Sequence, residues 1–159
     1  MRSLIIYYSY SGNTKKVAEH LCGYLRQRGQ ADIVQLKAQD ESDSFFGQCL
    51  RAFWRKRARI EPVNCNLSSY DAICFGAPVW AFAPPPAMNA YLDQVQNIQD
   101  KEVILFTTYG SGTGNNRCLN YMQQILANKG AKSFKRFSIQ QFKVNDYDFV
   151  RGRIQAALT

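Results

Sequence analysis

The chain has 159 residues, of which 46% are hydrophobic and 13% aromatic, with 20 basic against 12 acidic residues. This length suits one domain, predicted over residues 1–159, and the apolar content excludes a disordered chain. No apolar run is long enough to span a membrane, and the early first strand leaves no room for a signal peptide. The cysteines number five, an odd count without close spacing. We therefore expect a cytoplasmic protein with free thiols.

Short apolar runs alternate with segments of helical periodicity along the chain. In order, we predict a strand at 4–8, a helix containing 17–25, strands at 33–36 and 72–76, a helix containing 88–95, a strand at 103–107, a helix containing 118–126, a strand at 134–139 and a helix containing 150–158. Asn145 is the expected cap of the last helix. Strands that alternate with helices predict an α/β fold, a doubly wound parallel sheet with helices on both faces.

The most informative segment is the loop between the first strand and the first helix, Ser9-Tyr10-Ser11-Gly12-Asn13-Thr14. Its backbone N–H groups lie at a helix start, where they have no partner within the helix and where the dipole favours negative charge. The hydroxyl groups add donors, and Gly12 permits a ligand to approach the backbone closely. The loop therefore predicts an anion site, with an ordinary polar helix cap as the alternative.

Two further unusual loops follow the third and fourth predicted strands. Residues 77–84, Ala-Pro-Val-Trp-Ala-Phe-Ala-Pro, present two large aromatic side chains between prolines. Residues 108–115, Thr-Tyr-Gly-Ser-Gly-Thr-Gly-Asn, present another aromatic side chain and three glycines. In an open parallel sheet, ligands bind outside the carboxyl ends of the strands, where these loops are expected to meet. An anion site beside aromatic and glycine-rich loops indicates a phosphorylated aromatic cofactor.

With these loops, the chain resembles the flavodoxin-like family over nearly its whole length and in the same order. Residues 9–14 resemble the family's phosphate loop for flavin mononucleotide (FMN). The strand and loop that contact the flavin ring in the family resemble residues 70–73 with Gly76 and the following residues 78–80. The loop that closes over the other edge of the ring resembles residues 108–112. The resemblance implies a flavodoxin-like five-stranded parallel sheet of order 2-1-3-4-5, with FMN as the cofactor.

The resemblance also implies which residues bind FMN. The phosphate loop should bind the phosphate, Trp80 and Tyr109 should flank the faces of the isoalloxazine ring, and backbone groups of the second and third loops should meet its pyrimidine edge. The expected cofactor-binding residues are Ser9, Ser11, Gly12, Asn13, Thr14, Pro78, Val79, Trp80, Ala81, Phe82, Thr108, Tyr109, Gly110, Ser111 and Gly112. Alternatively, Trp80 or Phe82 packs into the core. No catalytic residue or metal ligand is assigned.

Two features depart from the family's usual pattern. Many relatives have glycine after the aromatic residue of the second loop, where a peptide can turn towards the flavin, but this chain has Ala81. Positive φ is costlier for alanine, so weak stabilisation of the one-electron reduced flavin is expected. The second departure is the net charge of +8, because many flavodoxins that carry electrons are acidic.

Much of the positive charge lies in one run without an acidic residue, formed by Arg51, Arg55, Lys56, Arg57 and Arg59. Just before it, apolar residues with helical spacing predict a helix over 45–54, capped by Ser42 or Ser44. One interpretation is a helix that covers the sheet and has a solvated basic end. The other is a docking surface for an acidic redox partner or an anionic membrane surface. Nucleic acid is a weaker option, because no binding motif accompanies the charge.

The sequence therefore predicts an FMN-binding redox protein, in which the flavin supplies the redox chemistry and the protein binds and orients it. We favour an electron-transfer carrier that docks a partner protein at the flavin edge, because the chain is small and shows no acid–base pair. The alternative is an FMN-dependent oxidoreductase linked to a nicotinamide or a quinone. A second alternative, a non-redox interaction module on the same scaffold, conflicts with the intact phosphate loop.

Overall fold

The computed structural model describes residues 1–39, 47, 49, 50, 54, 57–110 and 112–159. Most of the helix predicted over 45–54, with its caps Ser42 and Ser44, lies outside the described residues. So do three members of the basic run and one residue of the expected site, namely Arg51, Arg55, Lys56 and Ser111. Among the described residues, no helix is long and apolar enough to cross a membrane. The five cysteines carry free thiols, as expected.

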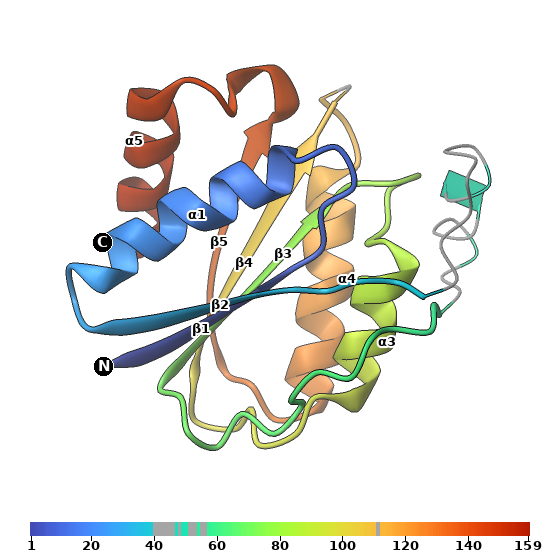
Figure 1. Ribbon diagram of the computed structural model, residues 1–159, viewed down its shortest axis with the longest axis vertical. Helices are drawn as coiled ribbons and strands as arrows, with labels where there is room; N and C mark the ends of the chain where they lie inside the picture. Colours follow the sequence, from blue (N-terminus) through green and yellow to red (C-terminus); the bar gives the residue numbers. More distant parts are fainter. Residues whose placement is uncertain (40–46, 48, 51–53, 55–56, 111) are drawn as a thin grey trace.

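Five strands form one parallel sheet in the order β2-β1-β3-β4-β5 (Figure 1). The strands are β1 (Arg2–Tyr7), β2 (Gln30–Gln35), β3 (Ala72–Pro78), β4 (Glu102–Tyr109) and β5 (Ser133–Gln140). In the described part of the chain, the α-helices with defined bounds are α1 (Asn13–Arg26), α3 (Pro86–Gln94), α4 (Asn115–Asn128) and α5 (Tyr147–Leu158), and a short 3-10 helix spans Gln141–Lys143. This arrangement confirms the predicted flavodoxin-like, doubly wound sheet and its strand order.

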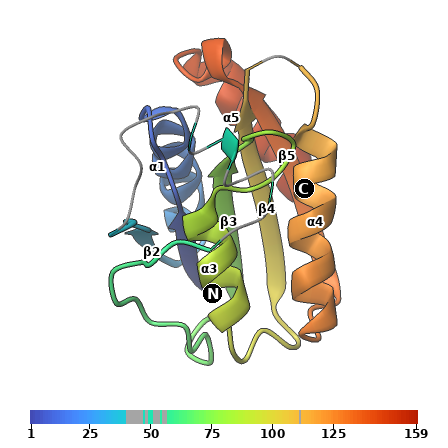
Figure 2. The same ribbon diagram turned by 90° about the vertical axis from the view of Figure 1, so that its right-hand side faces the viewer.

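Helices cover both faces of the sheet, and each face has its own buried core (Figure 2). On one face, α3 and α4 pack residues such as Tyr91 against strand residues that include Phe75. On the other face, Leu21 of α1 and Ile154 of α5 pack in a cluster with Cys74. Phe75 and Cys74 are neighbours in β3, so successive side chains of one strand enter opposite cores.

The ends of the helices follow local sequence signals. Pro85 and Pro86 stand at the start of α3, where proline fits because the first N–H groups of a helix have no partner. The cap of α5 is Asp146, whose carboxylate accepts a hydrogen bond of 3.0 Å from the backbone N–H of Phe149. The prediction of Asn145 as this cap was wrong by one residue. The Asn145 amide oxygen instead accepts a hydrogen bond from Lys16 Nζ at 2.8 Å.

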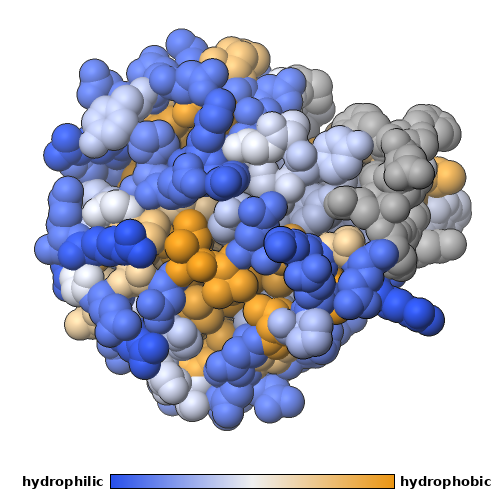
Figure 3. Space-filling model, viewed as in Figure 1, coloured by the Kyte–Doolittle hydropathy of each residue, from blue (hydrophilic) through white to orange (hydrophobic). Residues whose placement is uncertain are grey.

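An irregular segment, residues 57–71, leads into β3 and covers part of the core beside α3. Ile60 pairs with Ala38 in an antiparallel bridge, and Leu67 is fully buried in the cluster on that face. Val34 and Val63 are only half-buried at its margin. Figure 3 shows that apolar side chains gather in the middle of the face seen in Figure 1. Arg57, a member of the basic run, binds both carboxylate oxygens of Asp93, with a distance of 3.0 Å between Nη2 and Oδ1.

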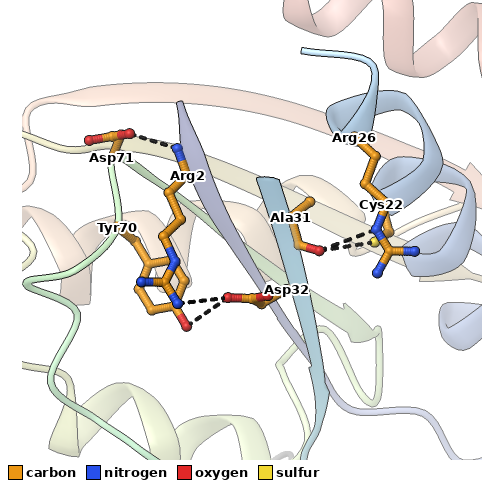
Figure 4. Close-up of polar contacts among 7 residues, drawn as sticks. All are labelled: Arg2, Cys22, Arg26, Ala31, Asp32, Tyr70 and Asp71. Carbon is orange, nitrogen blue, oxygen red and sulfur yellow. Dashed lines mark hydrogen bonds and ion pairs between the residues drawn. The ribbon is translucent and has the colours of Figure 1, made fainter. Parts of the chain in front are cut away.

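Polar contacts connect the residues at the end of the sheet where strands β1, β2 and β3 begin (Figure 4). The backbone N–H of Arg2 donates to Asp71 at 2.6 Å, and its guanidinium lies 3.3 Å from Asp32 Oδ2. The Tyr70 hydroxyl donates to the same oxygen of Asp32 at 3.1 Å. Burial acts to raise the pKa of Asp32, but hydrogen bonds from Arg2 and Tyr70 outweigh it, and the pKa is lowered.

The lowered pKa of Asp32 predicts that this end of the sheet loses stability in acid. An aspartate in an unfolded chain has a pKa of about 3.9, so stability from the charged form is complete above that pH. It is lost as the pH falls from there through the lower pKa of the folded state. The pair is partly exposed, so solvent screening limits its contribution to roughly 0.2–1 kcal/mol. Urea unfolding between pH 7 and pH 3 should show that Asp32→Asn removes part of the acid sensitivity, and an unchanged pH profile would contradict this.

Candidate cofactor site

The loop between β1 and α1 lies at the carboxyl end of the sheet and has the geometry of an anion site. Gly12, with φ of +88°, is the N-cap residue of α1, and it has no side chain that could accept a hydrogen bond from the first turn. Ser9 Oγ accepts a hydrogen bond from the Lys15 N–H at 3.2 Å, so Ser9 does act as a helix cap. Among the described residues, no hydrogen bond occupies the backbone N–H groups of Asn13 and Thr14. These donors are therefore available to an anion.

A buried hydroxyl pair connects this loop to the third one. Thr14 Oγ1 and Thr108 Oγ1 lie 2.8 Å apart, and both side chains are almost fully buried. A hydroxyl donates one hydrogen bond and accepts up to two, so Thr14 can accept from Thr108 and still donate to a ligand. The Val79 N–H donates to the carbonyl oxygen of Thr108 at 2.8 Å, which connects the second loop to the third. The three predicted loops are thus fastened to one another.

The three loops surround one cavity of about 520 Å³. It is lined by Tyr10, Ser11, Asn13, Thr14, Cys49, Pro78, Val79, Trp80, Ala81, Thr108, Tyr109, Gly110 and Gln141. Ten of these residues were in the predicted set. Four predicted residues do not line this cavity, namely Ser9, Gly12, Phe82 and Gly112, and Ser111 lies outside the described residues.

Three lining residues were missed by the sequence analysis. Tyr10 lies within the phosphate loop itself, and its ring is 46% exposed. Gln141 follows β5, so the rule that places ligands at the carboxyl ends of strands would have found it if applied to the fifth strand. Cys49 lies far from the three loops in sequence, and no local signal marks it. Burial raises the pKa of the Cys49 thiol, which therefore contributes an uncharged wall.

Trp80 is part of the cavity wall and also part of the core. Only 4% of it is exposed, and its ring meets the rings of Tyr8 and Tyr10 edge-on, with centroids 5.5 and 5.7 Å apart. This T-shaped contact is a favourable geometry for aromatic pairs and fixes the indole. Tyr109, on the third loop, is half-buried and lines the cavity from the other side. Trp80 thus combines the two interpretations that the sequence left open, a cavity wall and a core residue.

The second loop closes in a two-residue turn. The N–H of Trp80 donates to the carbonyl of Ala83, and the N–H of Ala83 donates back, both at 2.9 Å. Ala81 and Phe82 between them have φ of +46° and +66°, which matches the mirror-image turns that usually carry glycine or asparagine. Ala81 therefore adopts the positive φ that makes alanine costly at this position.

Phe82 turns away from the large cavity and packs over the start of α4. A Cβ at Gly114 would lie 2.3 Å from Phe82 Cδ1, so only glycine leaves room for the ring. The guanidinium of Arg117 lies 6.0 Å from the centroid of the same ring. Phe82 also borders a smaller hollow of about 120 Å³ beside Tyr109 and Thr113. This hollow shares Val79, Ala81, Tyr109 and Gly110 with the large cavity and extends it between the two loops.

The comparisons with known proteins agree with this geometry. Residues 1–143 match the model of the family described as NADPH-dependent FMN reductase. The chain belongs to this family. Its membership, within the flavodoxin-like fold, confirms the predicted resemblance and FMN as the cofactor. No curated protein matches the chain significantly.

Solved structures similar to this family member include both flavodoxins and reductases. A flavoprotein from Lactobacillus acidophilus NCFM in complex with FMN is 23% identical, with 92% of this chain and 98% of that one covered and a TM-score of 0.68. Flavodoxin 1 from Bacillus cereus is 16% identical over all of both chains, with a TM-score of 0.64. An NADH:FMN oxidoreductase is 16% identical, covering 98% and 88%, with a TM-score of 0.65. At these identities the likeness shows the fold.

The residues of this FMN reductase family member fit FMN. The free N–H groups of Asn13 and Thr14 suit a phosphate, and 520 Å³ lies within the usual range of 300–1,000 Å³ for ligand cavities. The lining side chains that the structure describes are uncharged, which suits the neutral isoalloxazine ring. The phosphate would thus be held by backbone N–H and hydroxyl groups, and the ring by Trp80, Tyr109 and the backbone of their loops.

Proposed function

We propose that the protein is an FMN-dependent oxidoreductase whose flavin accepts hydride from a reduced nicotinamide nucleotide. One observation carries the proposal: the three loops enclose a single cavity in a chain whose family model is described as NADPH-dependent FMN reductase. FMN supplies the redox chemistry when it is bound. The chain's residues bind the phosphate and hold the ring between the second and third loops. Hydride transfer to the flavin needs no acid or base from the protein, which agrees with the uncharged side chains among the described lining residues.

Arg117 supports a nicotinamide nucleotide as the electron donor. It lies on the first turn of α4 near the ring of Phe82, and Phe82 borders the smaller hollow between the loops. It makes no hydrogen bond or ion pair with any residue that the structure describes. A cation in the first turn of a helix is unfavourable, and the ring of Phe82 is the stabilising neighbour that the described residues give it. The phosphate groups of a dinucleotide would give this guanidinium a partner.

The test is direct reduction of the FMN-loaded protein by NADPH or NADH without oxygen. We expect the yellow colour of the oxidised flavin to bleach faster than free FMN does, with a rate that saturates as the nucleotide concentration rises. Arg117→Gln should lower the rate at low nucleotide concentration roughly tenfold, as expected for one lost charged hydrogen bond of about 1.5 kcal/mol. Arg153→Gln, at an exposed arginine of α5, is the matched control, and reduction by dithionite should be equal in all variants.

The electron carrier is the second candidate function. Its support is the full-length likeness to the Bacillus cereus flavodoxin and the basic charge of the chain, which suits an acidic redox partner or an anionic membrane surface. Of the basic run, Arg57 is engaged with Asp93, so a docking surface would rely on the other members. A protein that bleaches only after a separate reductase is added, at a rate that falls steeply with salt, is a carrier and not the oxidoreductase proposed here.

A further inference from the structure

A second cavity lies on the other side of the molecule, between α1 and α5, which pack side by side on one face of the sheet (Figure 1). Its volume is about 180 Å³, and it shares no residue with the cofactor cavity. An engineered protein cavity of about 150 Å³ is large enough to bind benzene. The space between α1 and α5 therefore admits one aromatic ring with a small substituent.

The walls of this cavity carry two aromatic rings from facing helices. Tyr24 comes from α1 and Tyr147 from α5, and the buried Ile154 adds an apolar surface between them. Each ring has one neighbouring aromatic or cationic side chain. His20 meets the Tyr147 ring edge-on with centroids 5.2 Å apart, and the Arg28 guanidinium lies 4.4 Å from the centroid of the Tyr24 ring. Tyr147 is 56% exposed and Tyr24 is half-buried, so both rings offer flat surface to a planar ligand.

Gly23 borders the cavity without a side chain. It lies in the middle of α1, where glycine costs about 1 kcal/mol relative to alanine. No atom lies within 4 Å of the place where its Cβ would be, so close packing does not require glycine there. A side chain at this position would extend into the open space that Gly23 borders.

The charges of the lining select an anion. Arg151 of α5 makes no hydrogen bond or ion pair with any of the described residues, although it lines the cavity. Among the described lining residues one is acidic, Glu19, and Lys15 Nζ lies 4.0 Å from its carboxylate in an exposed pair. An anionic group on the ligand would give Arg151 its missing partner.

We propose that the cavity between α1 and α5 binds a single-ring aromatic compound that carries a carboxylate. The ring lies between Tyr24 and Tyr147, and the carboxylate meets Arg151. This inference does not depend on the proposed oxidoreductase activity, because the two cavities share no residue.

Benzoate is the probe, added to the FMN-loaded protein and followed by calorimetry and by NMR of the protein amide groups. For a ligand of this size we expect saturable binding with a Kd of about 1 mM or tighter. The amide shifts should concentrate on α1 and α5 and spare the three cofactor loops. Benzyl alcohol, which is neutral and of similar shape, should bind at least fivefold more weakly. Equal affinities, or shifts confined to the cofactor loops, would overturn the proposal.

Leucine substitutions at two different glycines supply the structural control. Gly23→Leu fills the cavity and should weaken benzoate at least tenfold, while the better helix propensity of leucine favours folding. Gly152→Leu makes the same change in α5, at a glycine that also has open space but does not line the cavity, and should leave the affinity unchanged. Arg151→Gln should remove the preference for benzoate over benzyl alcohol. Undiminished benzoate binding by Gly23→Leu would refute the site.

Discussion

Replacing Ser11 and Thr14 together by alanine is expected to weaken FMN binding by roughly two to four orders of magnitude. Both side chains line the cavity at the start of α1, and each hydroxyl can donate to the phosphate. A hydrogen bond to a charged group contributes about 1.5–3 kcal/mol, and each 1.4 kcal/mol is a factor of ten in affinity. Titration of the apoprotein with FMN, followed by quenching of the flavin fluorescence, measures the loss.

Riboflavin separates a phosphate effect from general damage to the site, because it has the same ring without the phosphate. We expect its affinity to change far less than that of FMN. Thr107→Ala is the matched control, since Thr107 is also a buried threonine in a hydroxyl pair, 2.9 Å from Ser138 Oγ, but it does not line the cavity. If FMN and riboflavin weaken equally, the loop does not hold the phosphate.

Gly76→Ala is expected to destabilise the fold more than the same substitution at Gly23, the glycine within α1. A Cβ at this position would lie 2.0 Å from Phe106 Cζ in the fully buried core. The Phe106 ring cannot retreat easily, because Phe137 is stacked on it with centroids 5.5 Å apart. Overpacking of this kind costs about 1–3 kcal/mol. For a domain of this size, that corresponds to a Tm lower by roughly 2–12 °C.

Gly23→Ala is the control for this experiment, because its added Cβ meets open space and should stabilise α1 by up to about 1 kcal/mol. Adding Phe106→Leu to Gly76→Ala should return part of the lost Tm, because the shorter side chain makes room for the methyl group. Thermal unfolding followed by circular dichroism measures all these variants. A Gly76→Ala protein that melts with the parent would show that the Phe106 ring has space to move.

The fold could be predicted from the sequence because buried parallel strands and amphipathic helices have distinct patterns. Even β5, in which the alternation of apolar and polar residues is interrupted, forms a strand at the edge of the sheet. Its charged residues can reach solvent or a partner there: Lys135 Nζ lies 3.5 Å from Glu102 and donates to the Leu158 carbonyl at 3.1 Å. The start of β2 was placed three residues late, because polar Gln30 and Asp32 at the other edge of the sheet hide the strand pattern.

The three loops of the site could be located from the sequence, but the directions of their side chains could not. Trp80 and Phe82 are both large, aromatic and two residues apart, and hydrophobicity does not say which one turns inwards. The positive φ angles of Ala81 and Phe82 decide it, because they reverse the chain between the two rings. Tyr10 and Gln141 carry no periodic signal, and only their places at the carboxyl ends of strands bring them to the cavity.

The turn at residues 80–83 means that FMN meets a wall that is arranged in advance. The left-handed conformations of Ala81 and Phe82 cost about 1–2 kcal/mol each. Two hydrogen bonds between Trp80 and Ala83 close the turn, and Phe82 packs against Gly114. The cost therefore falls on folding and not on binding. The strain of this turn therefore lowers the stability of the fold, and the contacts that offset it come from the protein itself.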